Sequence, residues 1–447
     1  MNHPGRSLSE PPVTSHTEDG LADREAAYYA QVEHNLPRNF MASLAHGMLG
    51  QTGFRLMSAP TFVPAYVFSL SGSKVAVGLA LGAQFVGMAM SSIWSATLIE
   101  HRDRVMKTVY SVGWLMRLQI FGLAVSAFLL SGQRALAAAW IFLLLYGFFS
   151  GMQGVAFNFL MSKVIPVNQR GKLVGMRNFS GGLIASGVAY LGGKYLVGLN
   201  AFGNGYASTF MLSFILTSVG ITALNFVREP QSLSVRSRPS RLLERLTDIP
   251  AMLRADPNYR RFFFARSLGA LGTAAVPFYI LYVGKFIHLS GAAIGYFSLA
   301  FLLAPTVSNL LWGKIADVSG YRLVFLLSVG LWGLSTVLLI FGTTLPLFLI
   351  AFCGLGAGLA GYMVASQNFV LEFGQSHELP MIIAVSDTAS HIMMVVGPLL
   401  GGLIATRLDY VDVFWLAVGF KLIAVLTVWR IQEPRRRSGA VPERLAE

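Results

Sequence analysis

The feature that most constrains this chain is a succession of long apolar segments separated by short polar turns. Each segment has about 20 residues or more, the length that an α-helix needs to cross the hydrocarbon core of a bilayer. The sequence therefore predicts an all-α integral membrane protein with about twelve transmembrane helices embedded in the lipid bilayer. The predicted spans are Phe40–Leu70, Val75–Leu98, Val105–Leu130, Leu136–Ile165, Leu173–Val197, Ala207–Val227, Arg261–Phe286, Ala292–Leu311, Leu323–Phe341, Leu345–Leu371, Met381–Thr406 and Val411–Trp429.

Composition supports this class and argues against several others. Hydrophobic residues make up 54% of the chain and charged residues 12%, whereas a soluble domain carries about 25% charged residues. The formal net charge is +13, but the basic residues gather in turns and tails, as the positive-inside bias requires. We therefore expect no nucleic-acid partner.

Enzyme chemistry finds no support in the sequence. The single cysteine, Cys353, allows neither an internal disulfide nor a cysteine metal site. No Gly-x-x-x-x-Gly-Lys-Ser/Thr phosphate loop is present, so ATP hydrolysis is not expected. We expect no catalytic residues, no bound metal and no cofactor.

The loops predict a topology. With an even number of spans, both termini lie on one side, and the strongly basic loops fall on that same side. This side is therefore predicted to be cytoplasmic, in a multi-pass protein of the plasma membrane, which is the inner membrane in a prokaryote. We expect a monomer with a cytoplasmic N-terminal tail, a six-helix bundle, a basic cytoplasmic linker, a second six-helix bundle and a cytoplasmic tail. Their predicted bounds are 1–39, 40–227, 228–260, 261–430 and 431–447.

One turn between two predicted spans carries a motif. Gly313, Asp317, Gly320 and Arg322 form Gly-x-x-x-Asp-x-x-Gly-x-Arg. A weaker copy, with Glu100 and Arg104, lies in the corresponding turn of the first half.

The two halves also repeat elsewhere in the sequence. Gly78 and Glu100 stand at the same separation as Gly295 and Asp317. A triplet of glycines recurs at the same spacing in the fourth and tenth spans, and a Gly-Gly pair recurs in the fifth and eleventh. We infer a duplicated six-span unit. The glycine triplets are Gly147, Gly151, Gly154 and Gly354, Gly358, Gly361.

The motif and its second copy resemble the loop signature of the major facilitator superfamily. The resemblance covers roughly residues 40 to 430. It implies two pseudo-symmetric six-helix bundles that rock about a central cavity and carry a small-molecule solute by alternating access. It also implies that spans 1, 4, 7 and 10 line that cavity, and that the motif turns act as gating loops.

Ionisable residues inside spans are candidates for function. The two deepest, Arg55 and Arg117, are positive, and no deep carboxylate matches them. By the resemblance, Arg55 lies in the solute path, whereas Arg117 is more easily read as a tie to a neighbouring helix. An unpaired Arg55 suggests an anionic solute. The predicted solute path contains Arg55, Asn158, Tyr279, Gln367 and Asn368.

Three further residues are candidates for coupling transport to protons or another ion. Asp387 and His391 lie one turn apart in span 11, and Arg177 takes a nearly equivalent place in span 5. A local pairing of Asp387 at the bilayer edge is the favoured alternative.

The sequence predicts a secondary active transporter of a small, anionic solute, and two alternatives stay open. One is an exporter of amphipathic drugs or metabolites, in which aromatic side chains dominate and the arginines are structural. Its usual Gly-Pro-x-x-Gly-Gly element is missing from span 5 but occurs at Gly397–Gly402 in span 11. The other is a membrane scaffold or sensor that kept the fold and docks a partner.

Overall fold

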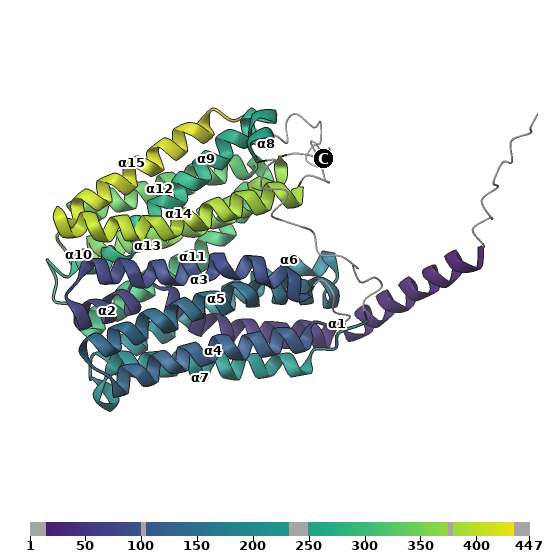
Figure 1. The fold of residues 1–447 in the computed structure, drawn as a ribbon, viewed down its shortest axis with the longest axis horizontal. Coiled ribbons are helices and arrows are strands. Elements are labelled where there is room, and N and C mark those ends of the chain that lie inside the picture. The colour runs from purple at the N-terminus through teal and green to yellow at the C-terminus, as the bar shows by residue number, and fades with distance from the viewer. Residues whose placement is uncertain (1–14, 100–103, 232–248, 374–378, 433–447) are drawn as a thin grey trace, which may run out of the picture.

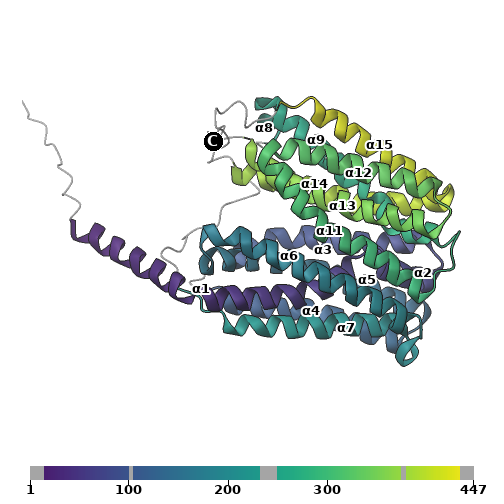
Figure 2. The ribbon, with the colours of Figure 1, turned by 180° about the vertical axis from the view of Figure 1, so that it is seen from behind.

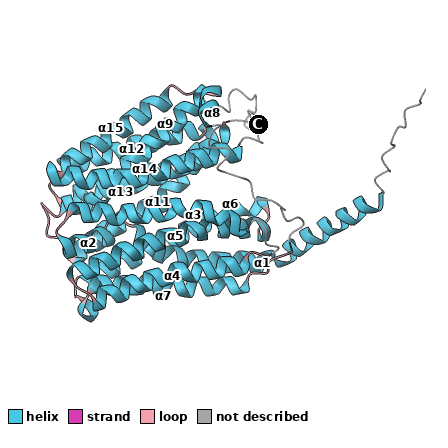
Figure 3. Ribbon diagram, in the orientation of Figure 1, coloured by secondary structure: helices cyan, strands magenta, loops and turns pink. Residues whose placement is uncertain are grey.

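The computed structural model describes residues 15–99, 104–231, 249–373 and 379–432. Within these ranges the chain is helical throughout and holds no strand (Figure 3). The helices are α1 (Ser15–Ser58), α2 (Phe62–Ser71), α3 (Lys74–Ile99), α4 (Met106–Leu129), α5 (Gly132–Val164), α6 (Val167–Leu191), α7 (Gly205–Thr222), α8 (Ile249–Ala255), α9 (Pro257–Leu271), α10 (Tyr279–Val283), α11 (Gly291–Ser319), α12 (Tyr321–Phe341), α13 (Leu345–Phe369), α14 (Leu379–Arg407) and α15 (Tyr410–Trp429).

Short polar residues in the turns fix where several helices begin. Asp256 accepts hydrogen bonds from the first amides of α9, with Pro257 in the first turn. Asn204 and Ser290 cap α7 and α11 in the same way. Asp409 and Asp412 form a reciprocal capping box on α15. These caps satisfy amides that would otherwise lack partners at the helix ends, so the long apolar runs are divided at defined points.

Three predicted spans are interrupted rather than continuous. The first breaks after Ser58, at Pro60, and resumes as α2. The seventh runs from α9 through a 3-10 segment, η5 (Gly272–Phe278), into α10. The fifth ends in a π-helical segment, η1 (Gly192–Val197). Proline and π-helical turns are ordinary causes of such breaks.

Helix α1 runs without a break from Ser15 through Pro37 into the first predicted span. Of the about twelve predicted spans, ten described helical segments are long and apolar enough to cross a membrane. The first, broken by Pro60, and the fifth, which carries Arg170, Lys172 and Arg177, do not meet that standard. Each still forms a helix where a span was predicted.

The helices form two groups that lie one above the other in Figure 1. One group contains α1 to α7, the N-terminal bundle, and the other α8 to α15, the C-terminal bundle. The N-terminal arm of α1 and helix α8 lie at one end, on the right of Figure 1 and on the left of Figure 2. We call this the linker end, and the opposite end, with α2 and α10, the distal end.

The repeated glycine triplets lie inside the bundles. Gly147 and Gly151 face Gln84 and Ser91 of α3, and Gly358 packs against Trp332 of α12. These glycines let neighbouring helices of one bundle approach closely. The contacts of the glycine triplets are therefore internal packing within each bundle.

Candidate functional site

The two bundles meet along a seam formed by two helix pairs. In the first pair, α6 and η1 lie against α11. A Cβ on Gly193 would come within 2.5 Å of the Gly295 Cα, and one on Gly291 would meet the backbone of Gly198. The backbones therefore touch directly across the seam, at the distal end.

The second pair, α3 and α14, closes the same end. Gly78 lies directly against the carbonyl of Pro398, and a Cβ on Gly402 would be 3.1 Å from the Lys74 carbonyl oxygen. The Lys74 ammonium donates to the Ala405 carbonyl at 2.5 Å. The two bundles are therefore joined here by a hydrogen bond as well as by the packing of the glycines.

Toward the linker end, α6 and α11 separate. Gly182 still meets Thr306 across the seam. Gly175 lies about two turns before Gly182 on the same face of α6, and Gly313 lies about two turns after Thr306 on α11. Neither glycine has a heavy atom of another helix within 4 Å of its Cβ direction among the described residues. The seam is thus closed distally and parted at the linker end.

Arg55 lies where the seam begins to part. Arg55 has two terminal nitrogens. A Cβ placed on Gly182 would lie 2.6 Å from one of them and would also contact Thr306 of α11. The other donates to the Asn178 carbonyl at 3.3 Å and to Gln51 Oε1 at 3.4 Å. Arg55 therefore joins a polar cluster of both bundles, formed by α1, α6 and α11.

The charge of Arg55 is not neutralised by the protein. In the part of the chain that the structure describes, no carboxylate lies within 4.0 Å of its guanidinium. The side chain is only partly buried. A half-buried guanidinium held by weak, neutral acceptors can exchange them for an anionic group.

The other residues of the predicted solute path differ in their surroundings. Asn158 and Gln367 are exposed, and Asn368 donates to the Val364 carbonyl of its own helix at 2.7 Å. Tyr279 is fully buried inside the C-terminal bundle, with its hydroxyl 3.1 Å from that of Thr336. The structure thus gives Tyr279 the surroundings of a packing residue and does not bring it to Arg55.

The predicted gating loop forms a tight turn between α11 and α12. Gly320 adopts φ 83° and ψ 167°, a backbone conformation that is essentially restricted to glycine. Arg322 donates to the carbonyl of Trp429 at 2.8 Å, which ties the turn to the end of α15. Asp317 and Arg104 are exposed. Glu100, of the weaker copy, lies outside the described residues.

Asp387 forms an ion pair with Arg266 of α9, with 2.5 Å between Oδ1 and Nη2. The Arg266 side chain is 7% exposed and that of Asp387 is 43% exposed, so the pair reaches from the bundle interior to a solvated surface. His391 follows one turn later on the same helical face. This pairing is the alternative that the sequence favoured for Asp387.

Arg117 is tied to a neighbouring helix, as the sequence favoured. Its guanidinium donates to the Thr217 carbonyl on α7 at 2.7 Å and to the Gly113 carbonyl at 2.6 Å. Arg177 does not approach Asp387: it points into the N-terminal bundle and stacks over Phe157, 4.3 Å from the ring centroid.

Sequence reasoning overlooked two charged residues inside predicted spans. Arg266 is the partner of Asp387. Lys421 of α15 is 1% exposed, and its ammonium has no hydrogen-bond partner in the described residues and lies 4.2 Å from the ring centroid of Trp332. Both could have been found by listing every charge within an apolar run, the rule that identified Arg55.

At the distal end, a small ionic cluster spans the seam. The Lys285 ammonium lies 2.6 Å from Asp409 Oδ1, and Lys74 of the other bundle lies 4.0 Å from the same oxygen. Partial burial raises the pKa of Asp409, but hydrogen bonds from Lys285 and the Tyr410 amide and the charges of both lysines bring that pKa below its usual value. The carboxylate is therefore ionised at neutral pH.

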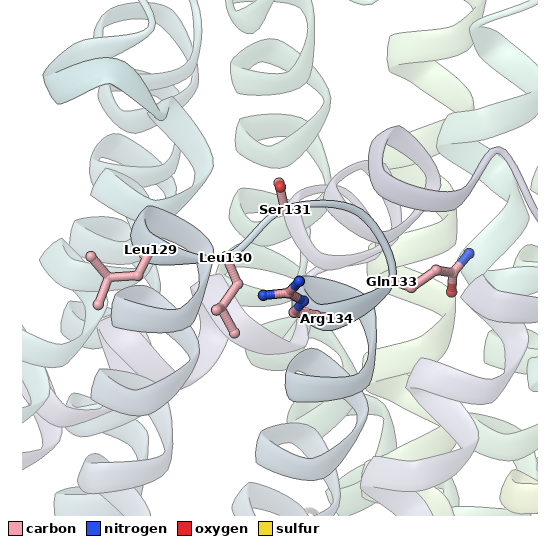
Figure 4. A pocket seen from close by; sticks show the side chains of 5 residues that line it. All are labelled: Leu129, Leu130, Ser131, Gln133 and Arg134. Carbon is pink, nitrogen blue, oxygen red and sulfur yellow. The ribbon is translucent and has the colours of Figure 1, made fainter.

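A pocket at the distal turn between α4 and α5 is unrelated to the seam. It is lined by Leu129, Leu130, Ser131, Gln133 and Arg134, all of them exposed (Figure 4).

Comparison with known proteins finds a partial family match and similar folds. The model of the Major Facilitator Superfamily matches residues 262–446. The fold resembles that of the nucleoside transporter NupG, with a TM-score of 0.62 and 16% identity over 87% of this chain and 99% of the other. The match to the family model covers less than half of the chain. A bacterial homologue of the iron transporter ferroportin, in an inward-facing state, is also similar in fold, with a TM-score of 0.65 and 12% identity over 88% of this chain and 98% of that one.

Curated transport proteins match only part of the chain. "Multidrug resistance protein 1" of Bacillus subtilis (strain 168) is 23% identical over 150 residues, which are 34% of this chain and 39% of that protein. "MFS-type transporter poxA" of Penicillium oxalicum is 27% identical over 189 residues, which are 42% of this chain and 32% of that protein. The matched part of this chain spans well under half the length of either relative.

Proposed function

We propose that the protein is a secondary active transporter that carries a small anionic solute by alternating access between its two bundles. The match of residues 262–446 to the Major Facilitator Superfamily model supports transport as the general activity. The single observation that carries the choice of solute is Arg55, an unneutralised guanidinium where the bundles part. In the proposed cycle, Arg55 binds an anionic group of the solute in place of its weak neutral contacts.

The proposed cycle uses the seam as its gate. The described state has the distal end closed and the linker end parted, which fits a state open toward the linker side. Closure on that side would bring the α6 face around Gly175 toward Gly313 of α11. The bundles of residues 40–227 and 261–430 would move as the two units.

Orientation and coupling complete the proposal. The basic loops at the linker end support its assignment to the cytoplasm. For a chain without a nucleotide-binding loop, the energy would come from a solute or ion gradient. Asp387, with His391 beside it, is the proposed proton carrier, because its carboxylate joins the interior Arg266 to solvent.

The test uses purified protein in proteoliposomes, with a panel of radiolabelled mono- and dicarboxylates and organic phosphates. We expect uptake of at least one anion by the wild type and a loss of more than tenfold in Arg55→Ala, with partial recovery in Arg55→Lys. Arg407→Ala, which removes an exposed arginine at the end of α14, is the control. Unchanged uptake of every anion in Arg55→Ala would contradict the assignment of Arg55.

A second candidate function is the export of amphipathic drugs. The observation that favours it is the match to relatives named as a multidrug resistance protein and as an efflux pump, the latter 26% identical over 150 residues. Ethidium efflux from inverted vesicles separates the two. Efflux that persists in Arg55→Ala, with no anion uptake by the wild type, would select the drug exporter.

A further inference from the structure

A second group of cationic side chains lies inside the N-terminal bundle, apart from Arg55. Four polar residues from four helices meet there, and each is more than nine-tenths buried. Three of them can carry positive charge. Their exposed fractions are 7% for His46, 1% for Arg117, 8% for Gln153 and 8% for Arg177.

Shared neighbours show that these side chains form one cluster. Phe157 contacts two of them: its ring centroid is 5.2 Å from that of His46 and 4.3 Å from the Arg177 guanidinium carbon. A Cβ on Gly50 would be 3.2 Å from the His46 ring and 3.8 Å from Arg117 Nη2.

Gln153 belongs to the same cluster. A Cβ on Gly113 would be 3.1 Å from both Arg117 Nη1 and Gln153 Nε2. The cluster therefore extends from α1 through α4 and α5 to α6.

Part of the cluster is satisfied by backbone carbonyls and part of it is not. Arg117 donates to two carbonyls, and His46 donates through Nδ1 to the Gly220 carbonyl at 3.1 Å. By contrast, Arg177 Nε and both polar atoms of Gln153 are buried without a hydrogen-bond partner among the described residues. A buried polar group without a partner costs about 1–3 kcal/mol, and more when it is charged.

The protein supplies no counter-charge to this cluster. Within the described ranges, neither Arg117 nor Arg177 has a carboxylate within 4.0 Å. In the C-terminal bundle, by contrast, the buried Arg266 is paired with Asp387. Two guanidinium groups in a low-dielectric interior repel each other and lose their hydration, so a bound negative charge would stabilise both.

We propose that this cluster binds a small monovalent inorganic anion of the size of chloride. The donors would be Arg177, the Gln153 amide and the free nitrogen of Arg117. Glycines form the wall beside these side chains, since Gly47 packs directly against Arg177 and Gly50 against His46. Such close packing favours a single small ion over an organic solute. The site involves neither Arg55 nor the seam, so it does not depend on the proposed function.

The test is thermal unfolding of the full-length protein in detergent, in sodium chloride and in sodium gluconate at equal ionic strength. A ligand that binds only the folded state raises the unfolding temperature with the logarithm of its concentration. We expect chloride to raise the unfolding temperature over gluconate, and Arg177→Gln to abolish that difference. Lys172→Gln removes an exposed charge from the same helix and should retain it.

A second variant keeps the test decisive if Arg177→Gln does not fold. Gln153→Leu removes the unpaired amide without changing the net charge, and it should weaken the apparent chloride affinity at least tenfold. Equal unfolding temperatures of the wild type in chloride and gluconate would overturn the proposal. So would a chloride response that is unchanged in Gln153→Leu.

The Arg55→Gln variant separates this site from the transport site. It should keep the full chloride response, whatever it does to transport. Loss of the response in Arg55→Gln, with retention in Gln153→Leu, would place the anion at the seam and overturn the proposed site.

Discussion

At the residue scale, the protein holds its in-span cations in three different ways. Arg117 is tied to backbone carbonyls, Arg266 to a carboxylate, and Lys421 only to the face of an aromatic ring. The first two arrangements offset much of the cost of burying a charge. The third offsets little of it, because a cation–π contact contributes about 0.5–2 kcal/mol.

Lys421→Met therefore gives a clear prediction. Methionine keeps an unbranched side chain, one atom shorter, and removes a buried, unpaired ammonium, so the unfolding temperature should stay the same or rise. Lys107→Met, at an exposed position of α4, should change it little. Differential scanning fluorimetry in detergent checks both. A fall of several degrees in Lys421→Met alone would mean that the amine has a stabilising partner.

The sequence allowed Arg55 and Arg117 to be recognised because each interrupts an apolar run. The sequence did not reveal the partners of these arginines. Arg117 donates to backbone carbonyls of its own helix and of α7. Because every residue has a backbone carbonyl, a sequence pattern does not single out the acceptor. Likewise, Tyr279 resembles a cavity residue by position, yet packing against Thr336 and Phe414 buries it.

At the scale of elements, the turn between α11 and α12 depends on a single backbone conformation. The sequence motif places Gly320 in this turn, and the structure gives it a positive φ. This part of the motif was readable because only glycine adopts such angles at low cost.

Gly320→Ala should therefore destabilise the protein by about 1–3 kcal/mol. Gly313→Ala is the matched control: Gly313 lies in the helix, with open space at its Cβ, so alanine should be neutral or stabilising by about 0.5–1 kcal/mol. Thermal unfolding of the two variants measures the difference. Equal stability of the two variants would contradict this account of the turn.

The distal ionic cluster gives a prediction that depends on pH. The pKa of Asp409 is lowered in the folded protein, so its stabilising contribution is complete above the ordinary aspartate pKa and is lost as pH falls through the lowered value. Asp409→Asn keeps a capping side chain but removes the charge.

We expect Asp409→Asn to unfold at a lower temperature than the wild type at pH 7. The difference should be small, because the carboxylate is 42% exposed, and it should vanish near or below pH 3. Unfolding curves across this range measure it. A difference that persists at the lowest pH would show that the charge is not the cause.

At the scale of the whole molecule, the order and position of the helices were predictable because each apolar run has the length of a bilayer span. The break at Pro60 was also readable, since proline removes a helical hydrogen bond. The meeting of the bundles was not: the contact of Gly193 with Gly295 involves glycines far apart in sequence, which only the packed structure brings together.

The central claim is that two bundles pivot across this seam, with one end open at a time. It is tested most directly by spin-label distances in lipid nanodiscs, in a Cys353→Ser background. One label pair, at Lys172 and Lys314, spans the linker end. The other, at Leu199 and His288, spans the distal end. All four positions are exposed.

Gly193→Val places side-chain atoms where the Gly295 backbone lies and should force the distal end apart. Gly187→Val, where no neighbour lies within 4 Å, is the control. We predict that in Gly193→Val the distal distance lengthens and the linker-end distance shortens, while Gly187→Val matches the parent protein. Lengthening at the distal end without shortening at the linker end would contradict a pivot between the two bundles.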